Sequence, residues 1–362
     1  MKINILLNDN FFNDHCTYSF AFPIFKSLNF IKDKGVNINF FYSYKEKLFD
    51  SDILIIDSRF CGKQKNLSEF IDKINKKKTK NNKIIFADTA DNSGQIKVEF
   101  LPVVDIYWKG QILKKKETYM KPHYGGRLFT NFYNKKFKIK DKNEQYSQPV
   151  TDKKLLKKIK VCWNMGLCDH GLYSHIKQKL FSIFKSRFFI SNTKRYYKED
   201  KKEHNLSCRI GIKYERETVE FQRKKISSIL NKYTNIKKLS RFKYLDEMEQ
   251  SKCVISPFGW GELCPRDFET FINNGILIKP DMSSFDTWPN WYLPKNNSTS
   301  GPTYLPFKWD LSNLEYQINF ALDKYQNLKQ FAVNGQNLYE KFTVGDHSKE
   351  LFTERFIKLV KN

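Results

Sequence analysis

Arg266 and Glu269 stand three residues apart at the start of a predicted helix within the segment 254–280. A short apolar run before them enters a loop that carries Gly259 and Gly261, and a second apolar run follows the helix. Such a strand, loop, helix and strand bring a phosphate-bearing ligand against backbone N–H groups and the positive end of a helix. A guanidinium there adds a fixed cation, and a glutamate one turn later can accept hydrogen bonds from a sugar hydroxyl. The alternative is a helix whose proline and acidic residues only favour its N-terminus.

The spacing Cys264-x-Arg266-x-x-Glu269 resembles the nucleotide-sugar site of GT-B glycosyltransferases, especially those of the exostosin-like group and of glycosyltransferase group 1. The similarity is strongest over residues 250–282. It implies that Arg266 lies near the donor diphosphate and that Glu269 holds the nucleotide ribose. Glu262 lies one position closer to Glu269 than the paired acids of many GT-B enzymes do, so only Glu269 is carried over.

The resemblance also implies two Rossmann-like doubly wound domains that face each other across a cleft, as in the GT-B fold. Residues 1–150 would form the acceptor domain with its linker, residues 151–345 the donor domain, and residues 346–362 a helix that returns to the first domain. The order of strand and helix signals is independently typical of an α/β chain. Continuous apolar runs in the first domain predict parallel strands covered on both faces. A fresh strand at 160–164 is expected to open the donor domain.

Three further loops of the donor domain follow predicted strands and could line the donor site. Gly166 would let the backbone approach a diphosphate, or it serves only a tight turn. Lys213 and Arg216 could neutralise a departing nucleoside diphosphate without a metal, or they are solvated cations. Asp281 follows a strand at the end where open sheets bind ligands, and a structural turn accounts for it equally well.

In the first domain, two acids lie at the end of a predicted strand, where they would face the cleft. Either Asp88 or Asp91 could take the proton from an acceptor hydroxyl, the general-base step that an inverting transfer needs. His15, in the loop after the first strand, is the competing base because its side chain titrates near neutrality. Arg127 follows paired glycines and could contact a pyrophosphate of the donor or of a lipid carrier.

The bulk properties are those of a folded protein with more than one core. A chain of 362 residues fits two domains of ordinary size, and 40% hydrophobic with 16% aromatic residues excludes disorder over most of its length. No run approaches the ~18 apolar residues that cross a bilayer, and the first residues are typical of a strand and not of a signal peptide. The seven cysteines are scattered and form no zinc spacing. We therefore expect a cytoplasmic protein, and the resemblance to GT-B enzymes implies that no metal or other cofactor takes part.

The formal net charge of +25 favours a polyanion or an anionic membrane leaflet as a partner. Nucleic acid is not expected, because the sequence carries no zinc fingers, no RNP-type aromatic strand and no Arg-rich recognition helix. A basic face on the cytoplasmic membrane suits an enzyme whose acceptor is lipid-linked. The segment 108–121, which mixes lysines with Trp108 and other apolar residues, is the candidate contact, although a solvated helix face accounts for it as well.

Together these patterns predict a metal-independent glycosyltransferase that moves a sugar from a nucleotide donor to a glycan acceptor. The resemblance alone suggests that the acceptor is lipid-linked and belongs to lipopolysaccharide O-antigen or capsule assembly. The alternatives are another two-domain nucleotide-sugar enzyme, such as an epimerase, and a basic nucleic-acid-binding protein. The donor nucleotide, the sugar, the acceptor hydroxyl, the stereochemical outcome and the oligomeric state remain open.

Overall fold

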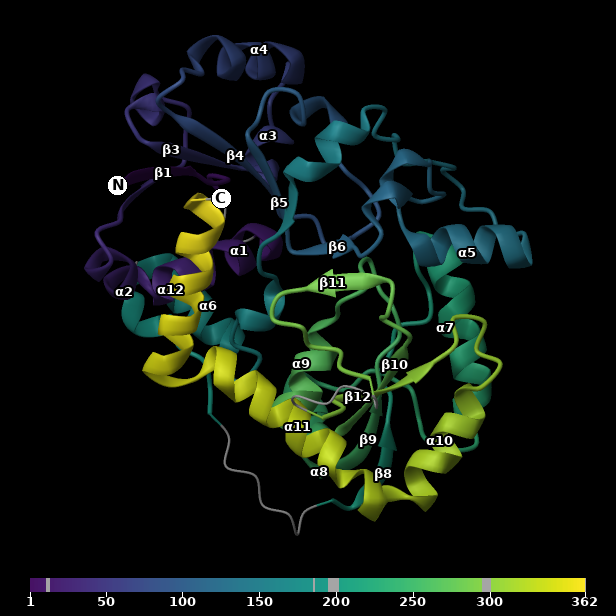
Figure 1. The fold of residues 1–362 in the computed structure, drawn as a ribbon. Coiled ribbons are helices and arrows are strands. Elements are labelled where there is room, and N and C mark those ends of the chain that lie inside the picture. Colours follow the sequence, from purple (N-terminus) through teal and green to yellow (C-terminus); the bar gives the residue numbers. More distant parts are fainter. Residues whose placement is uncertain (11–13, 185, 195–201, 295–300, 362) are drawn as a thin grey trace.

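A computed structural model of the chain describes residues 1–10, 14–184, 186–194, 202–294 and 301–361. Within these residues the strands form three sheets, and the two larger sheets are entirely parallel. Helices accompany both of them (Figure 1). The expected parallel α/β class is therefore confirmed. Among the described residues, no helix combines the length and the apolar character needed to cross a membrane.

The first sheet has six strands in the order β2-β1-β3-β4-β5-β7. In chain order its strands are β1 (Lys2–Leu6), β2 (Asn37–Phe41), β3 (Ile53–Asp57), β4 (Lys83–Asp88), β5 (Ile106–Lys109) and β7 (Ile159–Val161). Every residue of β3 is buried, because helices cover both faces of the sheet, and this is why the strand is continuously apolar. The helices that accompany this sheet are α1 (His15–Lys26), α2 (Leu28–Asp33), α3 (Ser58–Cys61) and α4 (Leu67–Lys77).

The second sheet has four strands in the order β12-β10-β9-β8. Its strands are β8 (His204–Ser207), β9 (Ser251–Ile255), β10 (Ile276–Pro280) and β12 (Tyr304–Phe307). Its helices are α7 (Glu217–Leu230), α8 (Arg241–Gln250), α9 (Pro265–Ile272), α10 (Leu314–Asp323) and α11 (Tyr325–Thr343). The antiparallel pair β6 (Gln111–Leu113) and β11 (Phe285–Thr287) lies between the two larger sheets (Figure 1).

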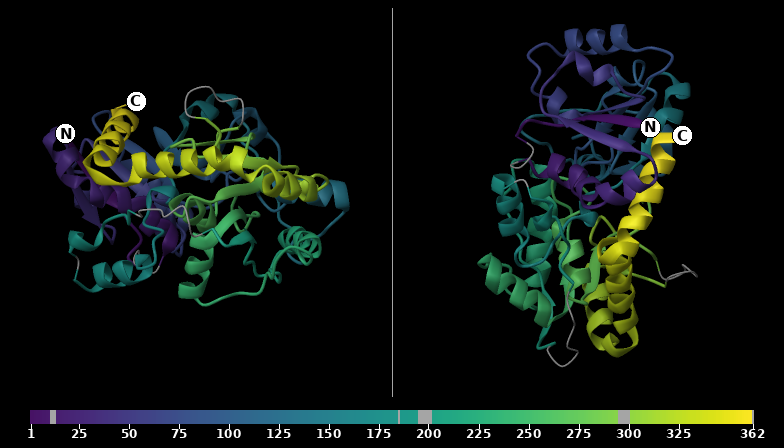
Figure 2. Two further views of the ribbon diagram at one scale, coloured as in Figure 1. Left: turned by 90° about the horizontal axis from the view of Figure 1, so that it is seen from below. Right: turned by 90° about the vertical axis from the view of Figure 1, so that its left-hand side faces the viewer.

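The remaining elements are helices and short turns that lie between these strands in the chain or pack one part of the molecule on the other. They are α5 (Leu128–Phe137), α6 (Ser174–Phe184), α12 (Gly345–Lys361) and the short 3-10 helices η1 (Glu46–Phe49), η2 (Val98–Phe100), η3 (Lys116–Met120), η4 (Lys153–Lys158), η5 (Met165–Leu167) and η6 (Arg187–Phe189). Helix α5 packs against α7, with the rings of Phe137 and Phe221 4.9 Å apart. Helix α12 returns to α1 and α2 and places Phe352 4.9 Å from the ring of Trp163 (Figure 2).

Strand β7 corrects one expectation about the division of the chain. It pairs in parallel with β5, with Tyr107 opposite Ile159, and is thus the edge strand of the first sheet. The expectation that it opens the donor domain is wrong. The physical reason is the apolar segment that follows the strand. Trp163 is buried against Trp108, with their rings 5.4 Å apart, so this part of the chain belongs to the first core.

The segment 108–121 is also not the surface that we expected. It forms β5, β6 and η3, and its apolar side chains Trp108, Leu113 and Tyr119 are buried in the core. Lys109 is buried as well. Because these apolar side chains face the interior, the segment cannot present them to a membrane.

Candidate functional site

A cleft of 470 Å³ opens between the two parts of the molecule, beside the start of α9. The larger sheet contributes His15 and Asp91 to its walls, and most of the rest comes from elements of the smaller sheet. Helix α9 starts where it does because Pro265 occupies its first turn and Asp267 accepts a hydrogen bond from the Cys264 N–H at 3.1 Å. The lining includes five cations, namely Arg209, Arg223, Lys238, Arg241 and Arg266.

Glu269 lies in the wall of this cleft, as its predicted role requires. Its side chain is only 4% exposed. Its carboxylate accepts hydrogen bonds from Arg241 at 2.5 Å and from the Tyr244 hydroxyl at 2.7 Å. Burial, followed by the charge of Glu269, raises the pKa of Tyr244, so the phenol stays protonated and acts as a donor. A carboxylate has about four acceptor positions, and the two named bonds leave capacity for a further hydroxyl.

Two guanidinium groups of the cleft have no carboxylate partner among the described residues. Arg266 donates to the main-chain carbonyl of Arg209. Arg223 donates to the carbonyls of Gly211 at 2.9 Å and Phe258 at 3.2 Å. Burial lowers the pKa of Arg223, because removing its charged guanidinium from water is unfavourable. An anionic ligand in the cleft would supply the missing negative charge.

The loop before α9 is docked on the first half of the molecule. At Gly261 a Cβ atom would lie 1.7 Å from the main-chain oxygen of Asp91, so only glycine permits this approach. Glu262, next to it, accepts from the Ser93 N–H and hydroxyl, both at 2.9 Å. Gly261 therefore serves the contact between the halves, and it also lines the cleft. At Gly259 the nearest atoms are at ordinary contact distance, and this residue does line the cleft.

The structure distinguishes the two candidate acids of the first half. Asp88 is buried, and its carboxylate accepts from Lys109 at 2.6 Å and from the Tyr107 hydroxyl at 2.7 Å. Its carboxylate is thus held in a buried ion pair and does not line the cleft, so its expected catalytic role is not supported. Asp91 is 29% exposed, and among the described residues its carboxylate forms a single, long ion pair, at 3.8 Å to Arg127.

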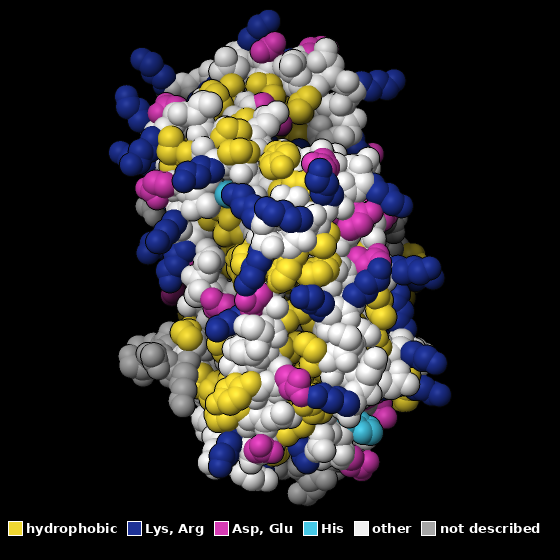
Figure 3. All heavy atoms as spheres, turned by 90° about the vertical axis from the view of Figure 1, so that its right-hand side faces the viewer, with side chains coloured by type: hydrophobic (Ala, Val, Ile, Leu, Met, Phe, Trp, Pro, Cys, Tyr) yellow, Lys and Arg dark blue, Asp and Glu magenta, His cyan; other side chains and the backbone are white. Residues whose placement is uncertain are grey.

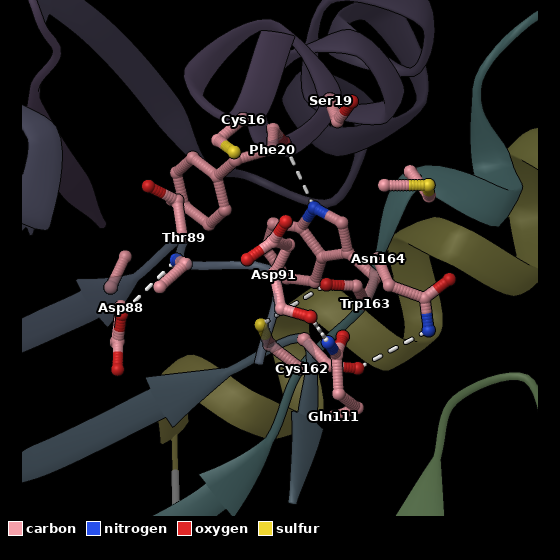
Figure 4. A pocket seen from close by; sticks show the side chains of 14 residues that line it. Cys16, Ser19, Phe20, Asp88, Thr89, Asp91, Gln111, Cys162, Trp163 and Asn164 are labelled. Atoms are coloured by element: carbon pink, nitrogen blue, oxygen red, sulfur yellow. Dashed lines mark hydrogen bonds between the residues drawn. The ribbon is translucent and has the colours of Figure 1, made fainter. Parts of the chain in front are cut away.

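A smaller enclosed pocket of 40 Å³ adjoins the cleft at the carboxyl end of the first sheet (Figure 4). Asp91 and Met165 line both cavities. In the close-up, Asp91 lies near the centre of the group, and Asp88 lies apart from it at the end of β4. The Asp91 main-chain oxygen accepts from Gln111, which fixes this turn of the backbone. Asp91 is thus the acid at the junction between the two cavities.

His15 also faces the cleft. It begins α1, whose first turn is capped by the Asp14 side chain through the N–H groups of Cys16 and Thr17. Desolvation by the surrounding walls lowers the pKa of His15, and the nearby His170 lowers it further. The imidazole is therefore neutral at pH 7 and can accept a proton, so the structure keeps His15 as the second base candidate.

Gly166 and Asp281 do not line the cleft. At Gly166 a Cβ atom would meet the Phe268 ring at 2.5 Å and Trp291 at 2.7 Å, so the residue is glycine because two aromatic rings pack on it. Its N–H already donates to Asn164 at 3.0 Å. Asp281 lies at a different cavity and accepts from the N–H and the hydroxyl of Ser283 at 3.0 and 2.6 Å, which is a structural turn.

Three predicted cations likewise lie outside the cleft lining. Lys213 is exposed. Arg216 donates to the Gly125 carbonyl at 2.8 Å and thereby connects α7 to the first half. Arg127 is buried and donates to the carbonyls of Gly125 and Trp260. Arg127 and Arg216 hold the two halves of the molecule together, because the main-chain carbonyls where the halves meet need hydrogen-bond donors. The expected phosphate contacts of these three residues are not supported.

Arg223 and Arg241 line the cleft but were not expected there from the sequence. A signal existed for Arg223, which lies four residues after Val219 and three before Ile226, both buried, and so occupies the apolar face of α7. Arg241 lies at the start of a short helix and is recognisable only once Glu269 is beside it. Among the described residues, no three metal-ligating side chains form a cluster.

No protein-family model and no curated protein matches this chain. Among solved structures, it is similar to an alpha-glucosyltransferase in complex with UDP and a 13-mer DNA containing a HMU base, with a TM-score of 0.43, 9% identity and full coverage of both chains. It is also similar to an alpha-glucosyltransferase in complex with UDP, with a TM-score of 0.42, 10% identity and full coverage. The GtfA/B complex has a TM-score of 0.38 at 10% identity, over 85% of this chain and 56% of the other. We base no functional conclusion on likenesses of this degree.

The geometry itself defines what the site can do. The cleft joins two guanidinium groups that form no ion pair with a carboxylate among the described residues, the N-terminus of α9 and the carboxylate of Glu269. These groups suit a ligand that carries both phosphates and hydroxyls. Asp91 and His15 place proton acceptors on the opposite wall.

Proposed function

We propose that the protein is a glycosyltransferase that takes a sugar from a nucleotide donor held in the 470 Å³ cleft. One observation carries this proposal: Arg223 and Arg266 lack carboxylate partners among the described residues at the place where α9 begins. Buried or half-buried cations are normally paired, and a diphosphate is a partner that also suits a helix N-terminus. The motif resemblance of Arg266 and Glu269 supports the same reading.

In the proposed mechanism, the second half of the molecule binds the nucleotide. Arg266, Arg223 and the N–H groups at the start of α9 hold the diphosphate, and Glu269 accepts hydrogen bonds from the ribose hydroxyls. Arg241 and Tyr244 fix the Glu269 carboxylate in a single orientation. When the bond to the sugar breaks, negative charge develops on the departing diphosphate, and preorganised cations stabilise that charge most where water is excluded.

The first half supplies the base. We assign this role to Asp91, because it lies at the junction of the two cavities and Asp88 is neutralised by Lys109. Asp91 would take the proton of the acceptor hydroxyl as that oxygen attacks the sugar carbon. His15 is the alternative base on the same wall.

The cations of the cleft would provide the charge compensation that other enzymes obtain from a divalent metal. We therefore propose that sugar transfer proceeds without added metal. The acceptor is proposed to be a lipid-linked glycan at the cytoplasmic face of a membrane, as in O-antigen or capsule assembly. The charge of +25 supports an anionic environment, but it does not choose the acceptor.

Thermal unfolding with UDP, GDP and CMP tests the donor site. A nucleotide that binds the folded state raises the melting temperature. We expect one of the three to do so in wild type, with a much smaller rise in Glu269→Ala. Lys213→Ala is the matched control, because Lys213 lies outside the cleft lining, and it should respond as wild type does.

The second stage uses the sugar nucleotide of the class identified in the first. Release of the free nucleotide in the presence of EDTA would be followed with a glycolipid acceptor, with duplex DNA and without acceptor. Release that depends on the glycolipid supports the proposal. Conversion of the sugar without any acceptor indicates an epimerase, and release only with DNA indicates a nucleic-acid acceptor. No response to any nucleotide, with Glu269→Ala indistinguishable from wild type, contradicts the proposed donor site.

A further inference from the structure

An apolar stripe on α6 and η6 faces outward instead of into the core. Ile176, Ile183, Phe184 and Phe188 are 55, 59, 64 and 83% exposed. The first three lie at positions i, i+7 and i+8 of one helix, and residues at these spacings share a face. Phe188 follows on η6, in contact with Phe189. Large apolar side chains that gather on a surface in this way mark an interaction site.

The rest of α6 shows that this exposure is a property of one face. Phe181 is buried and packs on Phe25 of α1, with the rings 5.5 Å apart. Lys177 forms an ion pair of 2.8 Å with Asp169. These contacts attach the helix to the protein by the side away from Ile176 and Ile183. Figure 2 shows α6 at the outer edge of the molecule.

The segment that carries the stripe has charge of one sign. From position 171 to 194 the sequence contains no Asp or Glu. Lys179 and Arg187 are exposed beside the apolar residues, on α6 and η6 respectively. On the face drawn in Figure 3, by contrast, Lys and Arg side chains are scattered among acidic and uncharged groups. The stripe therefore combines apolar and cationic groups without acids.

We propose that α6 and η6 dock on the surface of an anionic lipid bilayer. Apolar side chains flanked by cations enter the boundary between head groups and acyl chains, and the cations meet the negative lipids. A second copy of the chain suits the stripe poorly, because each copy carries +25 and brings cations against cations. Nucleic acid would meet the cations, but exposed isoleucines gain little from a phosphate backbone.

The same helix borders the proposed active site, and this part of the inference rests on the proposed function. A chamber of 300 Å³ has Ser174, His175 and Gln178 of α6 on one side and His15 and Glu269 on the other. His15 and Glu269 also line the donor cleft. Docking through α6 would thus hold the mouth of this chamber near the head groups, where the sugar of a lipid-linked acceptor is found.

Sedimentation with lipid vesicles tests the docking surface. The full chain would be mixed with vesicles of phosphatidylcholine alone or of phosphatidylcholine with phosphatidylglycerol. We expect wild type to sediment with the anionic vesicles and far less with the neutral ones. The double variant Ile183→Ser with Phe188→Ser should lose about tenfold or more in partitioning, because two large apolar side chains no longer enter the bilayer. Lys179→Gln should weaken binding mainly at low salt.

Tyr316→Ser is the matched control, since Tyr316 is 66% exposed but lies on α10. It should sediment as wild type does, and all variants should keep the melting temperature of wild type. Equal sedimentation of wild type and the double variant overturns the proposal. The proposal is also overturned if wild type does not sediment with the anionic vesicles. It is overturned as well if wild type binds duplex DNA but not vesicles, and the double variant loses that DNA binding. The nucleotide response is measured separately by thermal unfolding. A protein that binds no nucleotide can therefore still be tested for vesicle binding.

Discussion

Buried or half-buried charges have different partners in two regions of the molecule. Beneath each sheet edge, a lysine and an aspartate are buried together: Lys109 with Asp88 at 2.6 Å and Lys279 with Asp267 at 3.0 Å. In the cleft, Arg223 and Arg266 donate to main-chain carbonyl oxygens, Arg266 also contacts Tyr244, and neither forms an ion pair with a carboxylate among the described residues. A buried charge by itself therefore does not make a residue functional. What distinguishes the candidate site is a pair of guanidinium groups that form no ion pair with a carboxylate among the described residues.

The strongest test of this comparison is Asp91→Asn. Because Asp91 lies at the junction of the cavities without a close counter-charge, loss of its basicity should lower kcat for sugar transfer by about 10²–10⁴-fold. The KM for the donor should change little, since the amide keeps the size of the side chain. Asp281→Asn makes the same change outside the cleft and should leave kcat unaltered. Full activity of Asp91→Asn, with loss in a His15→Gln variant, would transfer the base to His15.

Lys109→Met tests the compensated region. It leaves the Asp88 carboxylate buried without its cation, which should lower the free energy of unfolding by about 3–5 kcal/mol. Urea denaturation measures this loss. Lys213→Met removes an exposed cation and should stay within about 0.5 kcal/mol of wild type. If Lys109→Met were as stable as wild type, Asp88 would not depend on the pair and would return as a base candidate.

Arg266→Met tests the uncompensated region. Removal of its guanidinium should raise the Kd of the nucleotide that stabilises the protein by about 10–100-fold, the equivalent of one charge-assisted hydrogen bond. The free energy of unfolding without nucleotide should fall much less than in Lys109→Met, because no buried carboxylate loses its partner. Calorimetric titration gives the Kd. An unchanged Kd together with a large loss of stability would place Arg266 among the structural charges.

The smallest expected effect concerns a buried group that stays neutral. Burial lowers the pKa of His170, which stacks on Phe268 with the rings 5.1 Å apart. The unfolded chain therefore binds a proton that the folded chain does not, so this residue makes stability increase as pH rises toward and past about 6.5. Unfolding free energies at pH 5.5 and 7.5 should differ less in His170→Asn than in wild type. An unaltered difference would show that His170 takes up its proton in the folded state.

The helices and strands could largely be predicted from local patterns, and the candidate site only in part. Continuous apolar runs indicated buried parallel strands such as β3, and the proline and acids before α9 indicated its start. The predicted pair Arg266 and Glu269 does lie in one cleft. The assignment of β7 to the donor domain was wrong, because the choice of sheet depends on which neighbour the strand meets.

Most errors at the site concerned residues of the right chemical type in the wrong surroundings. Gly166 and Gly261 are glycines because side chains or backbone from elsewhere approach them, and not because a phosphate does. Arg127 and Arg216 both donate to the Gly125 carbonyl. Nothing local in the sequence shows such partners, since Arg216 and Gly125 are 91 positions apart.

The sequence alone therefore determined the elements and the chemical groups that they carry, because helix starts, turns and buried strands follow from neighbouring residues. Tertiary structure decided which charged groups meet a counter-charge. Asp88 and Asp91 are almost adjacent in the chain, yet one is paired with Lys109 and the other is left at the cleft. The physical reason is that compensation of a charge depends on atoms within a few ångströms, and folding brings those atoms from distant parts of the chain.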